Sequence, residues 1–113
     1  MARAVDEFDR VREWGQFHTR RNLILALVSE IGELAETVQW LGDEDIPSQF
    51  LDGSWLAHFE EEVAEVAIYL VRLAQVTGVD LAEAMNRKLE VNEERYPVDS
   101  ARGSATKATR RVE

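Results

Sequence analysis

The sequence contains no cysteine and only two histidines, His18 and His58. Without cysteine, the chain has no disulfide, no thiolate metal site and no cysteine nucleophile. Two histidines are also too few for the usual zinc sites, in which histidine and cysteine supply most of the ligands. If the chain holds a metal, its carboxylates are therefore the expected ligands.

Long hydrophobic runs are missing as well. No apolar run approaches the ~20 residues that a membrane span needs, and the first residues do not resemble a signal peptide. We therefore expect a cytoplasmic protein without a membrane partner.

Basic residues are scarce beside acidic ones. The chain has 13 Lys and Arg against 22 Asp and Glu, a formal net charge of −9. Binding to a nucleic-acid polymer depends on Lys and Arg that neutralise phosphates, so we expect no such partner. An acidic protein that handles phosphates would need a divalent cation as intermediary.

The length and composition suit one small globular domain. The chain has 113 residues, of which 45% are hydrophobic, so a core can form. Small domains bury a modest fraction of their surface. Self-association would be a natural way to bury more.

Apolar residues recur at helical spacing along most of the chain, and no segment has the pattern of a strand. We predict an all-α fold of four helices, similar to a four-helix bundle. Asn22 is the expected N-cap of the second helix and Gly42 its stop, while Ser54 and Gly78 should bound the third. Asp80 with Glu83 predicts a capping-box-like start for the fourth. The expected helices are 4–18, 23–41, 55–77 and a segment from Asp80 to just before Pro97.

After Pro97 the hydrophobic periodicity ends. Residues 98–113 contain Ser, Thr, Ala and Gly, with four basic and two acidic side chains. We predict a helical domain over residues 1–97 and a flexible basic tail over residues 98–113, with a loop at 43–53 between the second and third helices.

The second and third predicted helices share one pattern. A shift of 32 positions superimposes their apolar residues, and the same shift lays Glu30 on Glu62 and Glu33 on Glu65. Two such helices packed antiparallel would be related by an approximate twofold axis. The glutamates of both could then converge at one edge of the packed surface.

Glutamate spacing alone is weak support for a metal site, because acid pairs three residues apart recur in this chain on what can be solvated faces. These four, however, border apolar stretches, where carboxylates are costly unless paired. Two carboxylates ~4 Å apart repel by about 4 kcal/mol at an effective dielectric of 20. An all-oxygen site suits Mg²⁺, Mn²⁺ or Ca²⁺, and Mg²⁺ favours substrate phosphates as further ligands.

Five segments follow one another in a fixed order: WGQFH with RNL at 14–23, SEIGELAE at 29–36, QW at 39–40, EEVAEVAIYL at 61–70 and NEERYP at 92–97. This ordered set resembles the MazG-like nucleotide pyrophosphohydrolases, in particular their dCTP pyrophosphatase branch. The resemblance implies Mg²⁺-dependent hydrolysis of a dNTP to its monophosphate and pyrophosphate. The all-oxygen ligand set leaves Mn²⁺ as the second candidate ion. It also implies a homodimer or homotetramer.

The resemblance also implies roles for individual residues. Glu30, Glu33, Glu62 and Glu65 match its metal ligands. Lys88 matches a position that meets phosphate, and Trp14, His18, Trp40, Tyr69, Asn92 and Tyr96 match positions around the nucleoside. Two positions depart from the pattern: Glu65 stands where the family usually has Asp, and Val5 stands where dCTP-preferring relatives have a histidine.

Several of these residues also have simpler interpretations. Trp14 can pack the first helix onto the bundle, and Tyr69 can be a half-buried tyrosine with a solvated hydroxyl. The predicted helix places Trp40 on the glutamate side, which favours a ligand contact. The row at Lys88, Asn92 and Tyr96 fits a pocket wall, and equally the edge of any amphipathic helix. Trp55 and His58 are expected to be structural and solvated, respectively.

Glu33 is our predicted catalytic base, because it lies further from the apolar stripe than Glu30 and could take a proton from water. The alternative to an enzyme is a non-catalytic helical bundle that binds a partner protein. Duplicated glutamate pairs beside apolar stripes favour the enzyme, since a scaffold would not need them.

Overall fold

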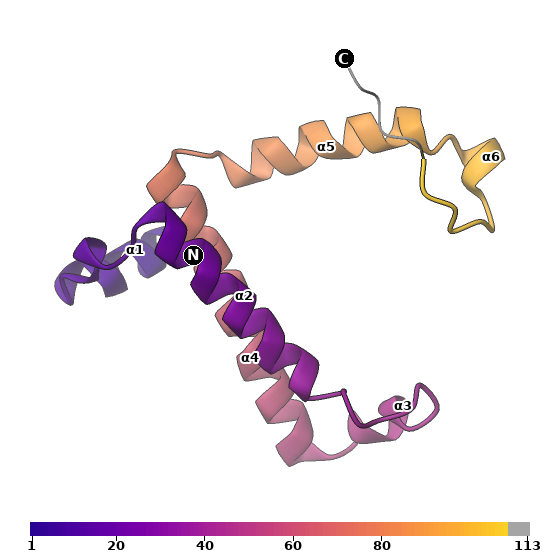
Figure 1. The fold of residues 1–113 in the computed structure, drawn as a ribbon, viewed down its shortest axis with the longest axis horizontal. Helices are drawn as coiled ribbons and strands as arrows, with labels where there is room; N and C mark the ends of the chain where they lie inside the picture. Colours follow the sequence, from indigo (N-terminus) through magenta and orange to yellow (C-terminus); the bar gives the residue numbers. More distant parts are fainter. Residues whose placement is uncertain (109–113) are drawn as a thin grey trace. The chain divides into compact units, whose positions relative to one another are not determined.

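The computed structural model describes residues 1–108, and every regular element in that range is helical. This confirms the all-α prediction. Figure 1 shows the elements in chain order, and the four long helices correspond to the four predicted ones. The elements are α1 (Ala2–Val11), a 3₁₀ turn (Trp14–Gln16), α2 (Arg20–Glu36), α3 (Ile46–Gln49), α4 (Gly53–Thr77), α5 (Leu81–Arg95) and α6 (Val98–Ala101). The four long helices are α1, α2, α4 and α5.

The chain divides into two units, 1–79 and a second that begins at Asp80, and each is described by itself. Packing of all four long helices in one bundle therefore stays a prediction, as does the domain boundary after Pro97. No helix within the described range is both long and apolar enough to cross a membrane. The cytoplasmic location also stays a prediction.

α1 is shorter than predicted. It ends at Val11 rather than His18, because Glu13 adopts a left-handed conformation with φ 54° that an α-helix cannot contain. The 3₁₀ turn that follows takes Trp14 out of the helical register and sets its ring edge-on to Phe8, with the centroids 5.6 Å apart.

α2 begins three residues before the predicted start at residue 23 and ends five residues before the predicted end at residue 41. Thr19 is the N-cap in place of Asn22, whose backbone amide donates to Thr19 Oγ1 at 3.1 Å. The helix ends at Glu36, where the Thr37 hydroxyl donates to the Leu34 carbonyl at 2.7 Å. Turns follow, so Gly42 is not the helix stop.

α4 begins with an aspartate cap rather than the predicted serine. The amides of Ser54 and Trp55 donate to Asp52 Oδ1 at 3.0 and 3.2 Å, and these bonds hold the pKa of Asp52 below its ordinary value, with the bond from Trp55 as the main cause. The predicted stop is confirmed, because Gly78 adopts φ 74° and its amide bonds to the Ala74 carbonyl. The preceding loop, predicted to be irregular, contains the single turn α3.

The first unit is built on the pairing of α2 with α4, which run antiparallel beside one another, with α3 in their connection (Figure 1). At its α3 end, Trp55 stacks on Phe59 at 5.2 Å and donates from Nε1 to the Thr37 carbonyl at 3.2 Å, which confirms its structural role. Burial is sparse: among the described hydrophobic residues only Val5 and Leu23 are buried.

The second unit contains α5, capped as predicted by Asp80, whose Oδ1 accepts from the Glu83 amide at 3.1 Å. The tail is more ordered than predicted. It forms α6, and the amide of Ala108 donates to the Tyr96 hydroxyl at 2.9 Å. The predicted flexibility of residues 109–113 lies outside the described residues.

Candidate metal and nucleotide site

Three of the four predicted metal ligands come together where α2 and α4 pack. Glu30 and Glu33 lie one turn apart on α2, and Glu62 faces them from α4. One carboxylate oxygen from each lies within 4.8 Å of the other two. We call these three residues the carboxylate cluster. Their convergence is the arrangement that the 32-residue shift predicts.

The cluster is electrostatically unfavourable without a cation. Glu30 Oε2 and Glu62 Oε2 are buried and have no hydrogen-bond partner among the described residues. Partial burial, with repulsion from Glu33, raises the pKa of Glu30 above its ordinary value of 4.5. Partial burial and the nearby Glu33 carboxyl group do the same for Glu62. Oxygen atoms in this state suit a hard divalent ion such as Mg²⁺ or Mn²⁺.

Glu65, the fourth predicted ligand, lies beside the cluster rather than within it. An open acidic depression of about 400 Å³ is lined by the cluster, Glu61, Ala64, Glu65 and Tyr69. Glu65 lies one turn beyond Glu61 on α4, with Tyr69 one turn further along. The depression is thus lined by carboxylates from both helices and by the phenol of Tyr69.

A second cavity, of about 420 Å³, adjoins the depression through Glu65 and Tyr69, which line both. Burial, followed by the charges of nearby carboxylates, raises the pKa of Tyr69, so its hydroxyl keeps its proton and can donate. We call this second cavity the apolar cavity. Its walls are Met1, Ala4, Val5, Phe8, Trp14 and Ile68, with His18, Asp9 and Arg72 on one side.

Three predicted nucleoside contacts, Trp14, His18 and Tyr69, therefore line one cavity beside the carboxylates. The rings of Trp14 and His18 lie edge-on, with centroids 6.2 Å apart. Such a mixture of aromatic faces and few polar groups is typical of sites for planar ligands.

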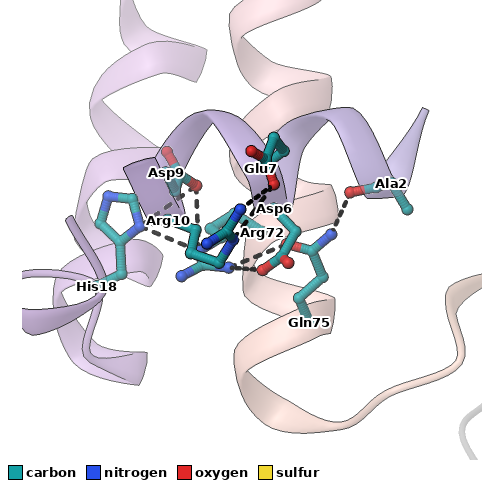
Figure 2. A network of polar contacts seen from close by, with 8 residues as sticks. All are labelled: Ala2, Asp6, Glu7, Asp9, Arg10, His18, Arg72 and Gln75. Carbon is teal, nitrogen blue, oxygen red and sulfur yellow. Dashed lines mark hydrogen bonds and ion pairs between the residues drawn. The ribbon is translucent and has the colours of Figure 1, made fainter. Parts of the chain in front are cut away.

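A polar network that the sequence did not predict lies along one side of this cavity. Figure 2 shows Arg72 of α4 between Asp6 and Asp9 of α1 and His18. Its Nη1 lies 3.1 Å from Asp6 Oδ1, and its Nε lies 3.1 Å from Asp9 Oδ2. The available signal was an arginine that interrupts the apolar pattern of residues 63–76, with no indication of its partner on a distant helix.

Trp40 is placed differently from the prediction. Because α2 ends at Glu36, Trp40 lies in a turn, is 88% exposed and lines neither cavity. The predicted position of Trp40 on the glutamate side of the helix is therefore wrong, whereas its role around the nucleoside stays a prediction. Lys88, Asn92 and Tyr96 lie on or just after α5, in the second unit, and their roles stay predictions. His58 is solvated as expected, with Nε2 3.9 Å from Glu62 Oε1.

The raised pKa values predict an unusual pH dependence for the metal-free protein. A carboxylate whose folded pKa lies above 4.5 binds its proton more tightly when folded, so folding stability should rise as pH falls from neutrality through that pKa. Thermal melting in EDTA between pH 7.5 and 5 measures this. Glu33→Gln should flatten the profile, because Glu33 is a main cause of both shifts, whereas excess Mg²⁺ should reverse its sign. A flat wild-type profile in EDTA would contradict the cluster.

The fold and the cluster together define an all-α protein with a carboxylate centre formed by two paired helices. The MazG-like family model matches residues 25–110, which covers most of the chain and includes most of α2 and all of α4. The chain belongs to the MazG-like family.

Curated relatives carry the comparison to one branch. The chain is 48% identical over 103 residues to dCTP pyrophosphatase 1 of Mus musculus and 47% identical to that of Homo sapiens. These alignments cover 91% of this chain but 61% of each relative, so the chain spans about three fifths of their length. This identity supports the dCTP pyrophosphatase-like branch.

A solved structure agrees with this placement. The crystal structure of a pyrophosphatase from Archaeoglobus fulgidus is 37% identical, with a TM-score of 0.76. The match covers 83% of this chain and 86% of the archaeal one.

Proposed function

We propose that this protein is a Mg²⁺-dependent nucleotide pyrophosphohydrolase that converts a dNTP and water to a dNMP and pyrophosphate. The observation that carries the proposal is the carboxylate cluster, with its two unpartnered buried oxygens, next to an apolar cavity of about 420 Å³. The names of the relatives and of the archaeal structure support the same chemistry.

Glu30, Glu33 and Glu62 would hold the metal, with Glu65 as a further ligand from the same depression. When bound, Mg²⁺ would neutralise phosphate charge and lower the pKa of a coordinated water. Mn²⁺ is the second candidate, because it takes the same oxygen ligands. Glu65 keeps the ligand type of the aspartate usual in the family and adds one methylene.

The protein's own residues divide the remaining work. Glu33, the exposed member of the cluster, is placed to accept the proton of the attacking water, while Glu30 and Glu62 are partly buried. Tyr69 can donate to the sugar or to a phosphate where the two cavities meet. Trp14 and His18 would contact the base. Lys88, Asn92 and Tyr96 are proposed for phosphate and nucleoside through the resemblance.

The substrate is proposed to be dCTP or a modified or non-standard dNTP, which would make the protein a nucleotide-pool enzyme. Its base would enter the apolar cavity, where Phe8 and Trp14 supply aromatic surface. Val5 is buried in that wall and offers no hydrogen bond, so polar recognition would fall to other side chains.

A panel of dNTPs and NTPs with product analysis tests the activity directly. We expect pyrophosphate and a monophosphate from one or a few dNTPs with Mg²⁺, and no product in EDTA. Melting should show stabilisation by Mg²⁺ and the preferred dNTP together, because ligands that bind the folded state raise its stability. Absence of both turnover and stabilisation would favour the non-catalytic helical bundle.

A homodimer or homotetramer is the proposed form. A chain with so few buried hydrophobic residues needs further burial, and three residues of α2 form an exposed apolar stripe. These are Ile24, Val28 and Ile31, at helical spacing. We call them the α2 stripe.

A further inference from the structure

The polar network beside the apolar cavity fixes the orientation of His18. Arg72 Nε donates to His18 Nδ1 at 3.1 Å and lies 3.1 Å from Asp9 Oδ2. The side chains of Arg72, Asp9 and His18 are 12%, 8% and 15% exposed. Arg72 is itself held by Asp6 and Gln75, and Gln75 Nε2 donates to the Ala2 carbonyl at 2.6 Å (Figure 2).

The chemistry of arginine decides the state of this imidazole. A guanidinium does not lose its proton in proteins, so Nε–H can only donate and His18 Nδ1 must accept. Protonation of Nδ1 would remove that acceptor and place a second positive charge against Arg72. Asp9 Oδ2 lies 3.6 Å from Nδ1, beyond hydrogen-bonding distance. These contacts fit the imidazole tautomer that carries its proton on Nε2.

The Nε2–H edge remains available to a ligand. Figure 2 shows Nδ1 turned toward the network and Nε2 on the far edge of the ring. His18 lines the apolar cavity and is its one imidazole, and Nε2 makes no hydrogen bond within residues 1–108. A neutral imidazole of fixed tautomer is a donor there and cannot accept.

We propose that Arg72 is a positioning residue that holds His18 as the neutral Nε2–H tautomer, so that His18 reads a hydrogen-bond acceptor on the nucleobase. The inference rests on the proposed function and deepens it. His18 would then favour bases that present a carbonyl oxygen or an unprotonated ring nitrogen to its Nε2–H. It would select against bases that present an N–H at this edge.

Nitrogen-15 NMR of histidine-labelled protein tests the tautomer without any need for turnover. The chain has two histidines, so a His58→Gln variant completes the assignment. We expect His18 to show an unprotonated Nδ1 and a protonated Nε2 at neutral pH. In Arg72→Met this pattern should give way to a mixture of tautomers, whereas the exposed Arg10→Met on α1 should leave it unchanged. A protonated Nδ1 in the wild type, or an unaltered spectrum in Arg72→Met, overturns the proposal.

Kinetics test whether Arg72 acts through His18. One base hydrogen bond contributes to substrate and transition state alike, so Arg72→Met should raise KM for the preferred dNTP about tenfold and change kcat less than about twofold. In a His18→Phe background the same substitution should add less than about twofold. An unchanged KM, or a full tenfold effect in both backgrounds, overturns the proposal.

Arg72→Met leaves Asp9 buried without its partner, so the pair Asp9→Leu with Arg72→Met, which removes both charges, replaces it if the single variant does not fold. A wild-type protein that hydrolyses no nucleotide but shows the expected spectrum defeats the proposed function. Turnover with an altered tautomer defeats this inference alone.

Discussion

Glu33→Gln should abolish pyrophosphate release while leaving the helices intact. The substitution removes one cluster ligand and the proposed base for the attacking water. Loss of general-base catalysis alone costs a factor of about 100 to 10,000 in rate. Steady-state kinetics with Mg²⁺ and the preferred dNTP measure the loss, and far-ultraviolet circular dichroism checks the fold.

A second readout separates this result from simple unfolding. Glu33 raises the pKa values of Glu30 and Glu62, so its neutralisation relieves repulsion in the metal-free protein. The melting temperature in EDTA should therefore stay the same or rise. Glu36→Gln is the matched control, one turn further along α2 and outside the cluster, and should keep both activity and stability. Unchanged release in Glu33→Gln would remove Glu33 from the site.

The sequence predicted the parts of the fold that depend on local chemistry. Helix content follows from hydrophobic periodicity, and the ends at Gly78 and Asp80 follow from backbone preferences that do not depend on the rest of the molecule. The convergence of Glu30, Glu33 and Glu62 was also predictable, because two helices with the same pattern pack in a symmetric way.

The errors arose where local signals were ambiguous or tertiary contacts decided. Thr19 and Asn22 are both acceptable N-caps, as are Asp52 and Ser54. In each pair the residue that comes first in the chain is the N-cap. The left-handed Glu13 had no signal, since glutamate rarely adopts that conformation. The predicted helical position of Trp40 was wrong because the second helix was predicted to reach residue 41, whereas α2 ends at Glu36.

Arg72 illustrates the limit of reasoning from spacing. Its partners on α1 and before α2 are 54 to 66 residues away in sequence, and only the packing of α1 on α4 brings them together. A single arginine in an apolar helix face indicates a buried partner but cannot identify it. The residue that orients His18 was therefore missed, although His18 itself was predicted.

Val28→Glu should dissociate the proposed homo-oligomer and lower its melting temperature. Val28 is 62% exposed at the centre of the α2 stripe, so in an isolated chain a glutamate there would change stability by no more than about 0.5 kcal/mol. Within an interface the same carboxylate would lose its water without gaining a partner. A cost of about 2 kcal/mol would lower the melting temperature by about 8 °C in a chain of 113 residues.

Light scattering coupled to size-exclusion chromatography gives the mass of each form, and melting gives the stability. Leu51→Glu is the matched control, because Leu51 is 88% exposed in the loop before α4 and lies outside the stripe. We expect it to keep the mass and melting temperature of the wild type. If Val28→Glu behaves like Leu51→Glu, the α2 stripe faces solvent and the burial that this chain lacks must come from another surface.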